Sequence, residues 1–315
     1  MSELAKKEFA AWELLQTIGE PEKRHEAAFV EHDGKFYLLG GRRMNPVSIY
    51  DPGTNTWKNG SVPPMEIHHF QPVSCKDRII MVGVMTGPFP TETAVKQVLE
   101  YYPATDEWKW SHEIPENRRR GGSGAVIRNG KIYVVCGIIH GHMGGYVNWM
   151  DEYDPETGDW KVLTDAPRAR DHFQAVELDG KIYAGGGRRT SAETKQVFDL
   201  VEPEMDIYDI ATDSWTVAKE PILTPRAGCF AMANQKDVII MGGESMAHLK
   251  AHSEVEAYNT INENWRALPP LLIGRHGTGV LIHQNYVYTC SGCGYRGGKP
   301  EMTYTERIKL SGLSQ

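Results

Sequence analysis

A motif of about fifty residues recurs six times along this 315-residue chain, and the repetition constrains the fold more than any single residue does. Each copy has an apolar stretch, a polar turn, a run ending in Gly-Gly or a variant of it, a Tyr and then a Trp. The tryptophans are spaced 51, 52, 55 and 50 residues apart, at Trp57, Trp108, Trp160, Trp215 and Trp265. A repeat of this length with four short strand patterns is typical of a β-propeller blade and not of a helical solenoid.

The copies align in two further columns. The Gly-Gly column comprises Gly40-Gly41, Val82-Gly83, Cys136-Gly137, Gly186-Gly187, Gly242-Gly243 and Ser291-Gly292. The Tyr column comprises Tyr50, Tyr102, Tyr153, Tyr208 and Tyr258. Together these columns resemble the kelch repeat over nearly the whole chain, from about Glu8 to Leu310. The resemblance implies an all-β fold, a single six-bladed kelch-type β-propeller.

We expect one propeller domain over residues 1–315, with blades near residues 20–65, 66–116, 117–167, 168–222, 223–271 and 272–310. The sixth copy lacks the segment with the Trp, whereas Trp12 near the N-terminus has no copy of its own. An N-terminal strand within 8–18 is therefore expected to pair with the strand at Arg307 to Leu310 and to close the last blade. Such closure leaves no exposed inner edge.

Composition narrows the possible partners and location. The formal net charge of −7 argues against nucleic acid as a partner. The first residues lack the apolar core of a secretory signal and no apolar run approaches a membrane span, so we expect a cytoplasmic protein with no membrane partner. The five cysteines form no disulfide framework pattern and are expected to be buried, reduced thiols.

Positive charge and imidazoles gather in two sets of loops. In a four-stranded blade, the segment leading into the innermost strand and the loop between the second and third strands emerge on the same face. These two sets of segments hold nine of the twelve histidines and most of the paired arginines, as in KRHEA, EIHHFQ, RARDHFQ, GRHG and the two GGRR sequences. We therefore expect an Arg- and His-rich mouth at one end of the central channel.

An anionic small molecule or oligosaccharide fits such a mouth. Arginine pairs bidentately with carboxylate, sulfate or phosphate, and a funnel of cations concentrates anions. The predicted ligand-binding residues are Arg24, His25, Arg42, His68, Arg120, Arg170, Asp171, Arg188, Arg226, Arg275 and Arg296.

The kelch resemblance also bears on activity, because kelch-like propellers include bacterial sialic acid mutarotases and certain polysaccharide lyases. It permits transformation of a uronate, sialate or sulfated sugar by lyase, epimerase or mutarotase chemistry. In that chemistry arginines hold the acid group while an imidazole or phenol moves a proton. The predicted catalytic residues are His69, His172, His276, Tyr295 and Glu244.

Two alternatives remain open. Many kelch proteins are non-catalytic interaction scaffolds, so a protein partner is one of them. The other is a metal enzyme, in which His25, His69, His172 and His276 would hold a divalent ion. Because the sequence has no tight ligand spacing, we expect no cofactor, and a divalent metal is the alternative.

Overall fold

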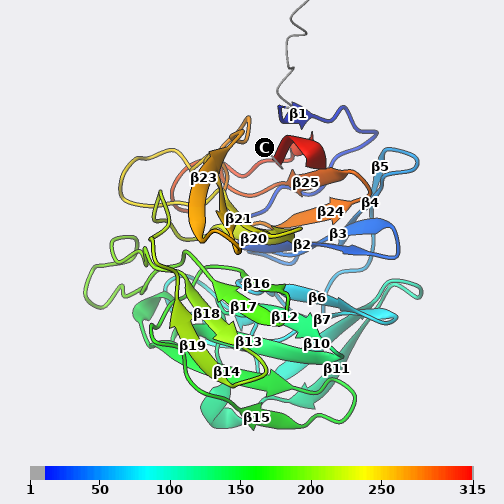
Figure 1. Ribbon diagram of the computed structural model, residues 1–315. Helices are drawn as coiled ribbons and strands as arrows, with labels where there is room; N and C mark the ends of the chain where they lie inside the picture. The colour runs from blue at the N-terminus through cyan, green and yellow to red at the C-terminus, as the bar shows by residue number, and fades with distance from the viewer. Residues whose placement is uncertain (1–10, 314–315) are drawn as a thin grey trace, which may run out of the picture.

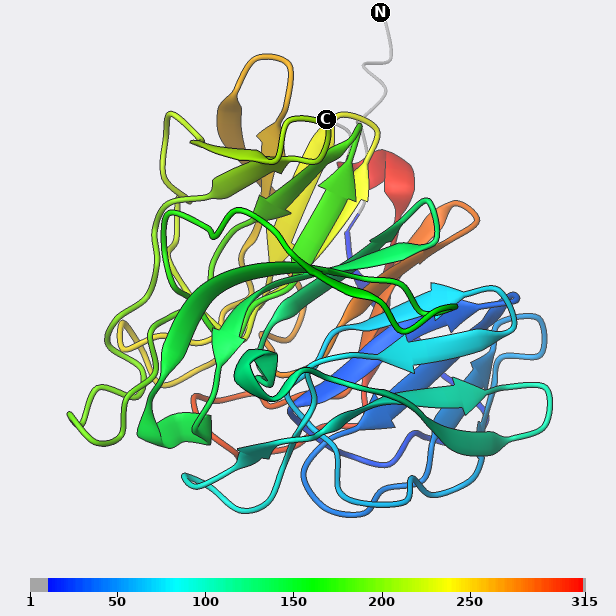
Figure 2. The ribbon, with the colours of Figure 1, turned by 90° about the horizontal axis from the view of Figure 1, so that it is seen from below.

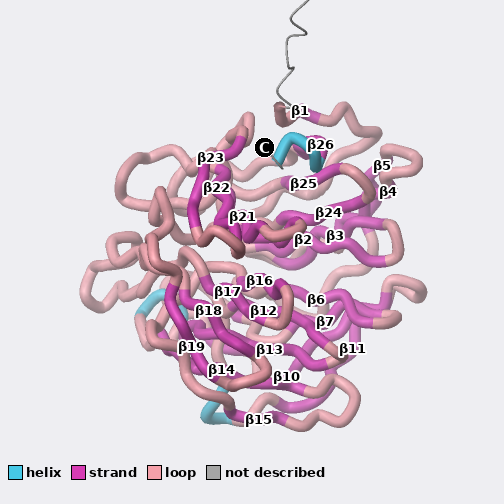
Figure 3. Tube along the Cα trace, viewed as in Figure 1, coloured by secondary structure: helices cyan, strands magenta, loops and turns pink. Residues whose placement is uncertain are grey.

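The computed structural model describes residues 11–313, which form six four-stranded antiparallel sheets and one small hairpin. Strands dominate the fold, and the helical segments are short turns (Figures 1 and 3). These turns are the 3-10 helices η1 (Glu116–Arg118), η2 (Gly141–Met143) and η3 (Leu310–Leu313). Within residues 11–313, no helical segment has the length and apolar character needed to cross a membrane.

The first three blades follow the chain in order. Blade one comprises β2 (Ala27–His32), β3 (Lys35–Gly40), β4 (Ser48–Asp51) and β5 (Thr56–Asn59). Blade two comprises β6 (Pro72–Cys75), β7 (Arg78–Met81), β10 (Gln97–Tyr102) and β11 (Glu107–Glu113), with the hairpin β8 (Met85–Thr86) and β9 (Thr93–Ala94) inserted in it. Blade three comprises β12 (Gly124–Arg128), β13 (Lys131–Ile138), β14 (Tyr146–Tyr153) and β15 (Trp160–Val162).

The remaining blades repeat the arrangement. Blade four comprises β16 (Ala175–Leu178), β17 (Lys181–Ala184), β18 (Asp206–Asp209) and β19 (Ser214–Val217). Blade five comprises β20 (Phe230–Asn234), β21 (Asp237–Met241), β22 (Val255–Asn259) and β23 (Asn264–Leu268). Blade six comprises β24 (Val280–His283), β25 (Tyr286–Cys290), β26 (Thr305–Lys309) and β1 (Glu13–Leu14).

The first strands of the blades surround the centre of the molecule. Each contacts the first strand of the next blade, in the order β2, β6, β12, β16, β20, β24 and back to β2. Figures 1 and 2 show the sheets following one another from blue through green to orange. The expected six-bladed propeller is confirmed.

The last blade is completed by the N-terminal segment, as expected. Glu13 of β1 pairs with Arg307 and Leu14 with Glu306 of β26. The backbone N–H of Leu15 extends the pairing to Thr305, so the contact lies slightly before the expected Arg307 to Leu310. Trp12 is buried and donates its indole N–H to the carbonyl of Pro269 at 3.0 Å. Residues 8–10 of the expected strand lie outside the described residues.

The apolar core lies between neighbouring blades, where the repeated aromatic residues pack. The Tyr and Trp of one blade stack with ring centroids 4.9–5.5 Å apart, for example Tyr50 on Trp57 and Tyr208 on Trp215. In blade two the partner of Trp108 is Tyr101, not the Tyr102 expected from the alignment. Tyr101 also makes the hydrogen bond to the turn residue five positions later, Asp106, that Tyr208 makes to Asp213.

Backbone conformation explains the Gly-Gly column. Gly242 has φ of +64°, and a Cβ at this position would lie 2.4 Å from the carbonyl oxygen of Arg275 in the next blade. Glycine therefore permits the close approach of blades where the channel is narrowest. The five cysteines are free and buried, as expected.

Candidate functional site

Five of the predicted ligand-binding arginines do not reach the mouth. Arg24, Arg120, Arg170, Arg226 and Arg275, here called the arginine column, are at most 1% exposed. Each lies inside its own blade and donates to backbone carbonyls. Arg226, for example, donates to Gly242 and Ile240, and Arg170 donates to Gly186 at 2.9 Å.

Acidic residues of the third strands neutralise the arginine column. Asp151 accepts from Arg120 and Asp206 from Arg170, both at 2.7 Å. Glu256 accepts from Arg226 at 2.7 Å, Glu306 pairs with Arg275, and in blade one Ser48 takes the equivalent place beside Arg24. The expectation that these guanidinium groups line the mouth is therefore corrected: most of their donors, though not Nε of Arg170 or of Arg275, are used by carbonyls and carboxylates that would otherwise be buried without partners.

A closed ring of backbone hydrogen bonds surrounds the channel just beyond the arginine column. We call its members the channel ring: Glu26, His69, Gly122, His172, Gly228 and Gly277. In turn, the N–H of each member from His69 to Gly277 donates to the carbonyl of the preceding member, at 2.6–3.1 Å. The N–H of Ala27 donates to Gly277 at 3.1 Å and closes the ring.

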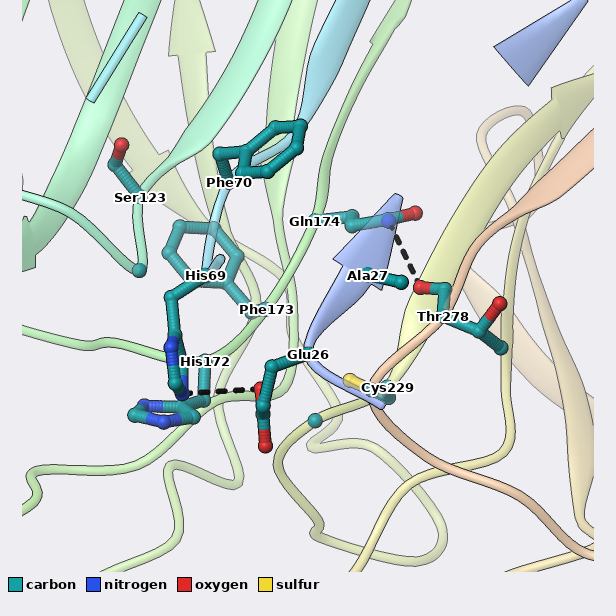
Figure 4. A pocket seen from close by; sticks show the side chains of 13 residues that line it. Glu26, Ala27, His69, Phe70, Ser123, His172, Phe173, Gln174, Cys229 and Thr278 are labelled. Carbon is teal, nitrogen blue, oxygen red and sulfur yellow. Dashed lines mark hydrogen bonds and ion pairs between the residues drawn. The ribbon is translucent and has the colours of Figure 1, made fainter. Parts of the chain in front are cut away.

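Every member of the channel ring has a left-handed backbone, with φ between +53° and +64°. Three blades place glycine there, which adopts this conformation without strain. The other three place Glu26, His69 and His172, at a cost of about 1–3 kcal/mol each. Strained residues of this kind cluster at functional sites, and these three direct their side chains into the channel (Figure 4).

Two cavities share Glu26 as a lining residue. A channel cavity of about 40 Å³ is lined by the channel ring and the residues that follow it, including Phe70, Phe173 and Gln174 (Figure 4). A larger mouth cavity of about 530 Å³ opens above it. Glu26 lines both, so its carboxylate stands at the boundary between them.

A third imidazole joins those of the channel ring. His142 lies in η2, in the loop after β13, and its ring centroid is 5.2 Å from that of His69 and 4.8 Å from that of His172. The His69 and His172 rings are 4.7 Å apart. We call these three residues the histidine cluster; all are buried, and His142 also lines the mouth cavity.

Buried carboxylates orient the histidine cluster. Glu92, which is 2% exposed, accepts from Nδ1 of His142 at 2.9 Å and from its backbone N–H at 3.0 Å, and it also pairs with Arg42. Asp171 accepts from Nδ1 of His172 and from the backbone N–H of Thr190. Each carboxylate therefore fixes one imidazole against rotation.

Burial sets the protonation states of this region. Burial lowers the pKa of His69 well below its usual value, lowers the pKa of His142 although Glu92 opposes the shift, and lowers the pKa of His68 to about 4. Burial alone would raise the pKa of Glu26, but the cationic surroundings, with His172 first, lower it to about 2. At neutral pH the neutral imidazoles of His69 and His142 thus lie beside an ionised Glu26.

The other predicted catalytic residues contact each other. Glu244 pairs with Arg188 at 2.6 Å and accepts from the N–H of Gly297 at 2.8 Å. His276 donates from Nε2 to the carbonyls of Tyr295 and Gly297. Tyr295 is 41% exposed. The structure brings Glu244 and His276 together, with Nε2 of His276 3.4 Å from the carboxylate.

Some of the remaining predicted ligand-binding residues line or adjoin the mouth cavity, and the others are buried behind the histidine cluster. His25, Arg42 and Arg188 line the mouth cavity. Arg296 lies over the ring of Phe198 at 5.7 Å, and Phe198 is also part of the cavity wall. His68 and Asp171 are fully buried and contact His69 and His172, respectively, so they support the site from behind.

The histidines that could hold a metal ion differ from the predicted set of His25, His69, His172 and His276. One ring nitrogen each of His69, His142 and His172 lies within 4.8 Å of the others, which is compatible with a shared metal ion. His25, in contrast, is bonded to Glu301 at 2.6 Å, and His276 is bonded to loop carbonyls. His248, His252 and Glu254 form a second, more exposed group of the same kind.

Sequence reasoning missed several residues of the site. The HGHMGG loop contains His142, but nothing local indicates that it folds back over the channel. Glu92 lies in an inserted loop with no counterpart in the other copies. The partners of the arginine column do leave a signal, because Asp151, Asp206 and Glu256 each stand two residues before the Tyr of the third strand.

Known proteins resemble this chain throughout the propeller. The family model of the Attractin/LZTR1 beta-propeller matches residues 4–251. Kelch-like protein terF of Aspergillus terreus is 24% identical over 87% of this chain and 61% of its own length. Beta-scruin of Limulus polyphemus is 26% identical over 84% of this chain and 30% of its own, and human Kelch-like protein 23 is 24% identical over 87% and 45%.

These curated relatives are longer proteins, of which the chain spans between under a third and about three fifths. Among solved structures, the one titled "Structure of YjhT" superposes with a TM-score of 0.77 at 15% identity and covers 91% of this chain and 95% of that one. At this identity the likeness is one of fold.

Proposed function

The chain belongs to the Attractin/LZTR1 β-propeller family, and we propose that it binds and transforms a small acidic sugar, a uronate, sialate or sugar sulfate, in the mouth cavity. The observation that carries the proposal is the meeting of two features. A cavity of about 530 Å³, the size of a typical small-molecule site, adjoins a strained, buried cluster of imidazoles and carboxylates.

The walls of the cavity suit a sugar with one acidic group. Phe89 and Phe198 supply aromatic surface on which the apolar face of a sugar ring can pack. Three arginines and three glutamates line the cavity, Arg42, Arg43, Arg188, Glu26, Glu66 and Glu244, so their formal charges cancel. Arg43 has the most exposed head of the three arginines, at 55%, and it is the best placed to take the acid group of the ligand.

The residues at the boundary of the two cavities are suited to proton transfer. His142 reaches the mouth cavity as a neutral imidazole held by Glu92, and Glu26 reaches it as a carboxylate. An imidazole fixed by a carboxylate is an effective general base. Abstraction of a proton from the carbon next to the ligand's acid group would give lyase or epimerase chemistry, and transfer from a ring hydroxyl would give mutarotase chemistry.

A ligand screen tests the binding half of the proposal. We expect uronates, sialic acids or sugar sulfates, but not the matching neutral sugars, to raise the melting temperature; a ligand at 100 times its Kd stabilises by about 2.7 kcal/mol. Arg43→Ala should remove the shift. The matched control is Arg189→Ala, which alters the second arginine of the other GGRR sequence, one that pairs with Glu202 and does not line the cavity. Equal shifts in both variants would refute the assignment of Arg43.

A second function is favoured by the outer rim of the same face. Large apolar side chains are more than 40% exposed in the loops between second and third strands: Met44, Phe89, Met246, Leu249 and Tyr295. The two loops of blades five and six contact each other, through Lys250 and Tyr295. Exposed apolar groups beside arginines are typical of protein-binding surfaces.

The two functions respond differently to substitution. Leu249→Ser with Met246→Ser should leave sugar binding intact if the mouth is an enzyme site. If the face is instead a docking surface, these changes should weaken capture of a protein partner while no acidic sugar shifts the melting temperature of the unmodified protein.

A further inference from the structure

We propose that His69, His142 and His172 bind one divalent first-row transition metal ion, such as Zn²⁺, at the boundary between the channel and the mouth, with Glu26 beside it as a fourth ligand or the partner of a bound water. This goes beyond the proposed function, because the site would bind metal whichever molecule occupies the mouth. A bound metal would occupy the Nε2 lone pair of His142, so the proton transfer of the proposed function would then fall to the Glu26 carboxylate.

The hydrogen bonds of the cluster determine which nitrogens carry protons. Nδ1 of His142 and Nδ1 of His172 face the carboxylates of Glu92 and Asp171, which only accept, so both Nδ1 atoms donate. An imidazole that donates from Nδ1 can offer its Nε2 atom to a metal ion. The Nε2 atoms of His142 and His172 lie 3.2 Å apart.

The same reasoning applies to His69. Nε2 of His68 donates to the carbonyl of Gly87 at 3.1 Å, so Nδ1 of His68 accepts from Nδ1 of His69 at 2.6 Å. Nε2 of His69 is left unprotonated. It is buried without a hydrogen-bond partner and lies 3.0 Å from a carboxylate oxygen of Glu26, as Figure 4 shows.

A metal ion between these three nitrogens and the carboxylate oxygen of Glu26 would bind all of them at once. A tetrahedral ion about 2.0–2.1 Å from two nitrogens holds them about 3.4 Å apart, close to the 3.2 Å between His142 and His172. Three imidazoles with an open fourth position are the ligand set of catalytic zinc sites. Glu92 and Asp171 then act as the outer carboxylates that fix ligating imidazoles.

The backbone supports the same conclusion independently. His69 and His172 occupy left-handed positions of the channel ring that glycine fills in three other blades. His142 comes from a separate loop, whose backbone is held by Glu92 and by the N–H of Ala192 at 2.7 Å. Two strained positions and one anchored loop therefore place three imidazoles around one point.

Cobalt provides a direct test, since Co²⁺ in a site of low coordination gives visible absorption bands. Chelator-treated protein, titrated with Co²⁺ and then Zn²⁺ in the absence of any sugar, should bind one equivalent of Co²⁺, which Zn²⁺ displaces. His142→Ala and His172→Ala should abolish the bands. Glu92→Gln, which keeps all three imidazoles, should weaken binding by about 10–100-fold. His248→Ala, in the exposed second group, is the matched control and should bind as the unmodified protein does.

A measurement on the unmodified chain covers the case in which a variant fails to fold. Ring-nitrogen NMR should show Zn²⁺ shifting the Nε2 resonances of three histidines and leaving their Nδ1 atoms protonated. Absence of stoichiometric binding, or binding lost in His248→Ala and kept in His142→Ala, would overturn the proposal. An Nε2 proton shared by His142 and His172 would then account for the 3.2 Å contact. Sugar-induced melting shifts in chelator-treated protein report on the mouth separately.

Discussion

The arginine column and the histidine cluster come closest in blade four, where Arg170 and His172 are two residues apart, yet the polar atoms of the column and of the cluster have different kinds of partner. In the column, Arg170 and Arg226 are matched with carbonyls and with Asp206 and Glu256 inside the same blade. In the cluster, the side chain of His69 comes from one blade and meets groups from others, with Nε2 left without a hydrogen-bond partner.

This difference in hydrogen-bond partners distinguishes residues that stabilise the fold from residues of the candidate site. A buried guanidinium whose NH groups are paired with carbonyls and with a carboxylate of its own blade holds a fold together, although Nε of Arg170 and of Arg275 has no hydrogen-bond partner. A buried polar atom without a partner, on a strained backbone, costs stability unless something binds there. The arginines looked functional in the sequence because they recur, but recurrence at one position in five of the six blades is typical of a structural role.

The largest effect is expected on catalysis. His172→Ala should lower turnover of an acidic sugar found in the ligand screen by about 10²–10⁴-fold, because it removes one imidazole of the cluster. Steady-state kinetics measures this, with His248→Ala as the control. Unchanged turnover would mean that the histidine cluster does not perform the chemistry. The cluster would then be structural, as the arginine column is.

The arginine column should respond in stability instead. Arg226→Met leaves Glu256 buried without its partner and should cost about 3–5 kcal/mol of unfolding free energy in urea denaturation. The double variant Arg226→Met with Glu256→Leu should recover part of that loss, since no unpaired charge remains. A folded Arg226→Met protein should still bind its ligand; loss of ligand binding at unchanged stability would place Arg226 in the site after all.

The backbone of the channel ring gives a smaller, cleaner effect. At position 172, glycine should be more stable than alanine by about 1–2 kcal/mol, because only glycine adopts the left-handed conformation without strain. The matched control is Gly122→Ala, in the preceding blade, where a Cβ would make only ordinary contacts, the nearest at 3.5 Å. It should be destabilised by a similar amount. If the alanine and glycine variants had the same free energy of unfolding at both positions, the left-handed backbone of the channel ring would not be strained.

The smallest effect concerns pH and Glu301 at the rim of the mouth. Burial alone would raise the pKa of Glu301, but hydrogen bonds from His25 and Arg43 lower it to about 2. A carboxylate with a lowered pKa stabilises the protein above its usual value near 4.5, and this stabilisation is lost as the pH falls towards 2. Because Arg43 is half exposed, we expect roughly 1 kcal/mol. In Glu301→Gln the acid limb of the stability curve should be shallower; an unchanged limb would contradict the assignment.

The fold was largely predictable, because blade geometry is a local property repeated many times. The spacing of Trp57 to Trp265 and the unmatched Trp12 were sufficient to predict six blades and closure by the N-terminal strand. The alignment slipped by one residue in blade two, where Tyr101 and Tyr102 are adjacent and both plausible. Only the pairing of Tyr101 with Trp108 distinguishes them.

The site was predicted only in part. His69 and His172 followed from their place at the start of inner strands, and the structure brings them together. His142 and Glu92 did not follow, because these loops between second and third strands differ in length and sequence from blade to blade, so the repeat does not predict where their side chains lie. Their contact across the channel joins residues fifty positions apart.

The sequence by itself determined the repeat, the ring and the face on which imidazoles gather, since strand alternation and blade spacing depend on neighbours along the chain. Only the tertiary structure decided which charged side chains are paired inside the blades and which can still contact a ligand. Asp206 reaches Arg170 and Glu92 reaches His142 only when strands and loops distant in sequence are packed together. Hydrogen-bond partners depend on that packing, which buries five of the predicted arginines inside their blades and brings three histidines together beside the mouth cavity.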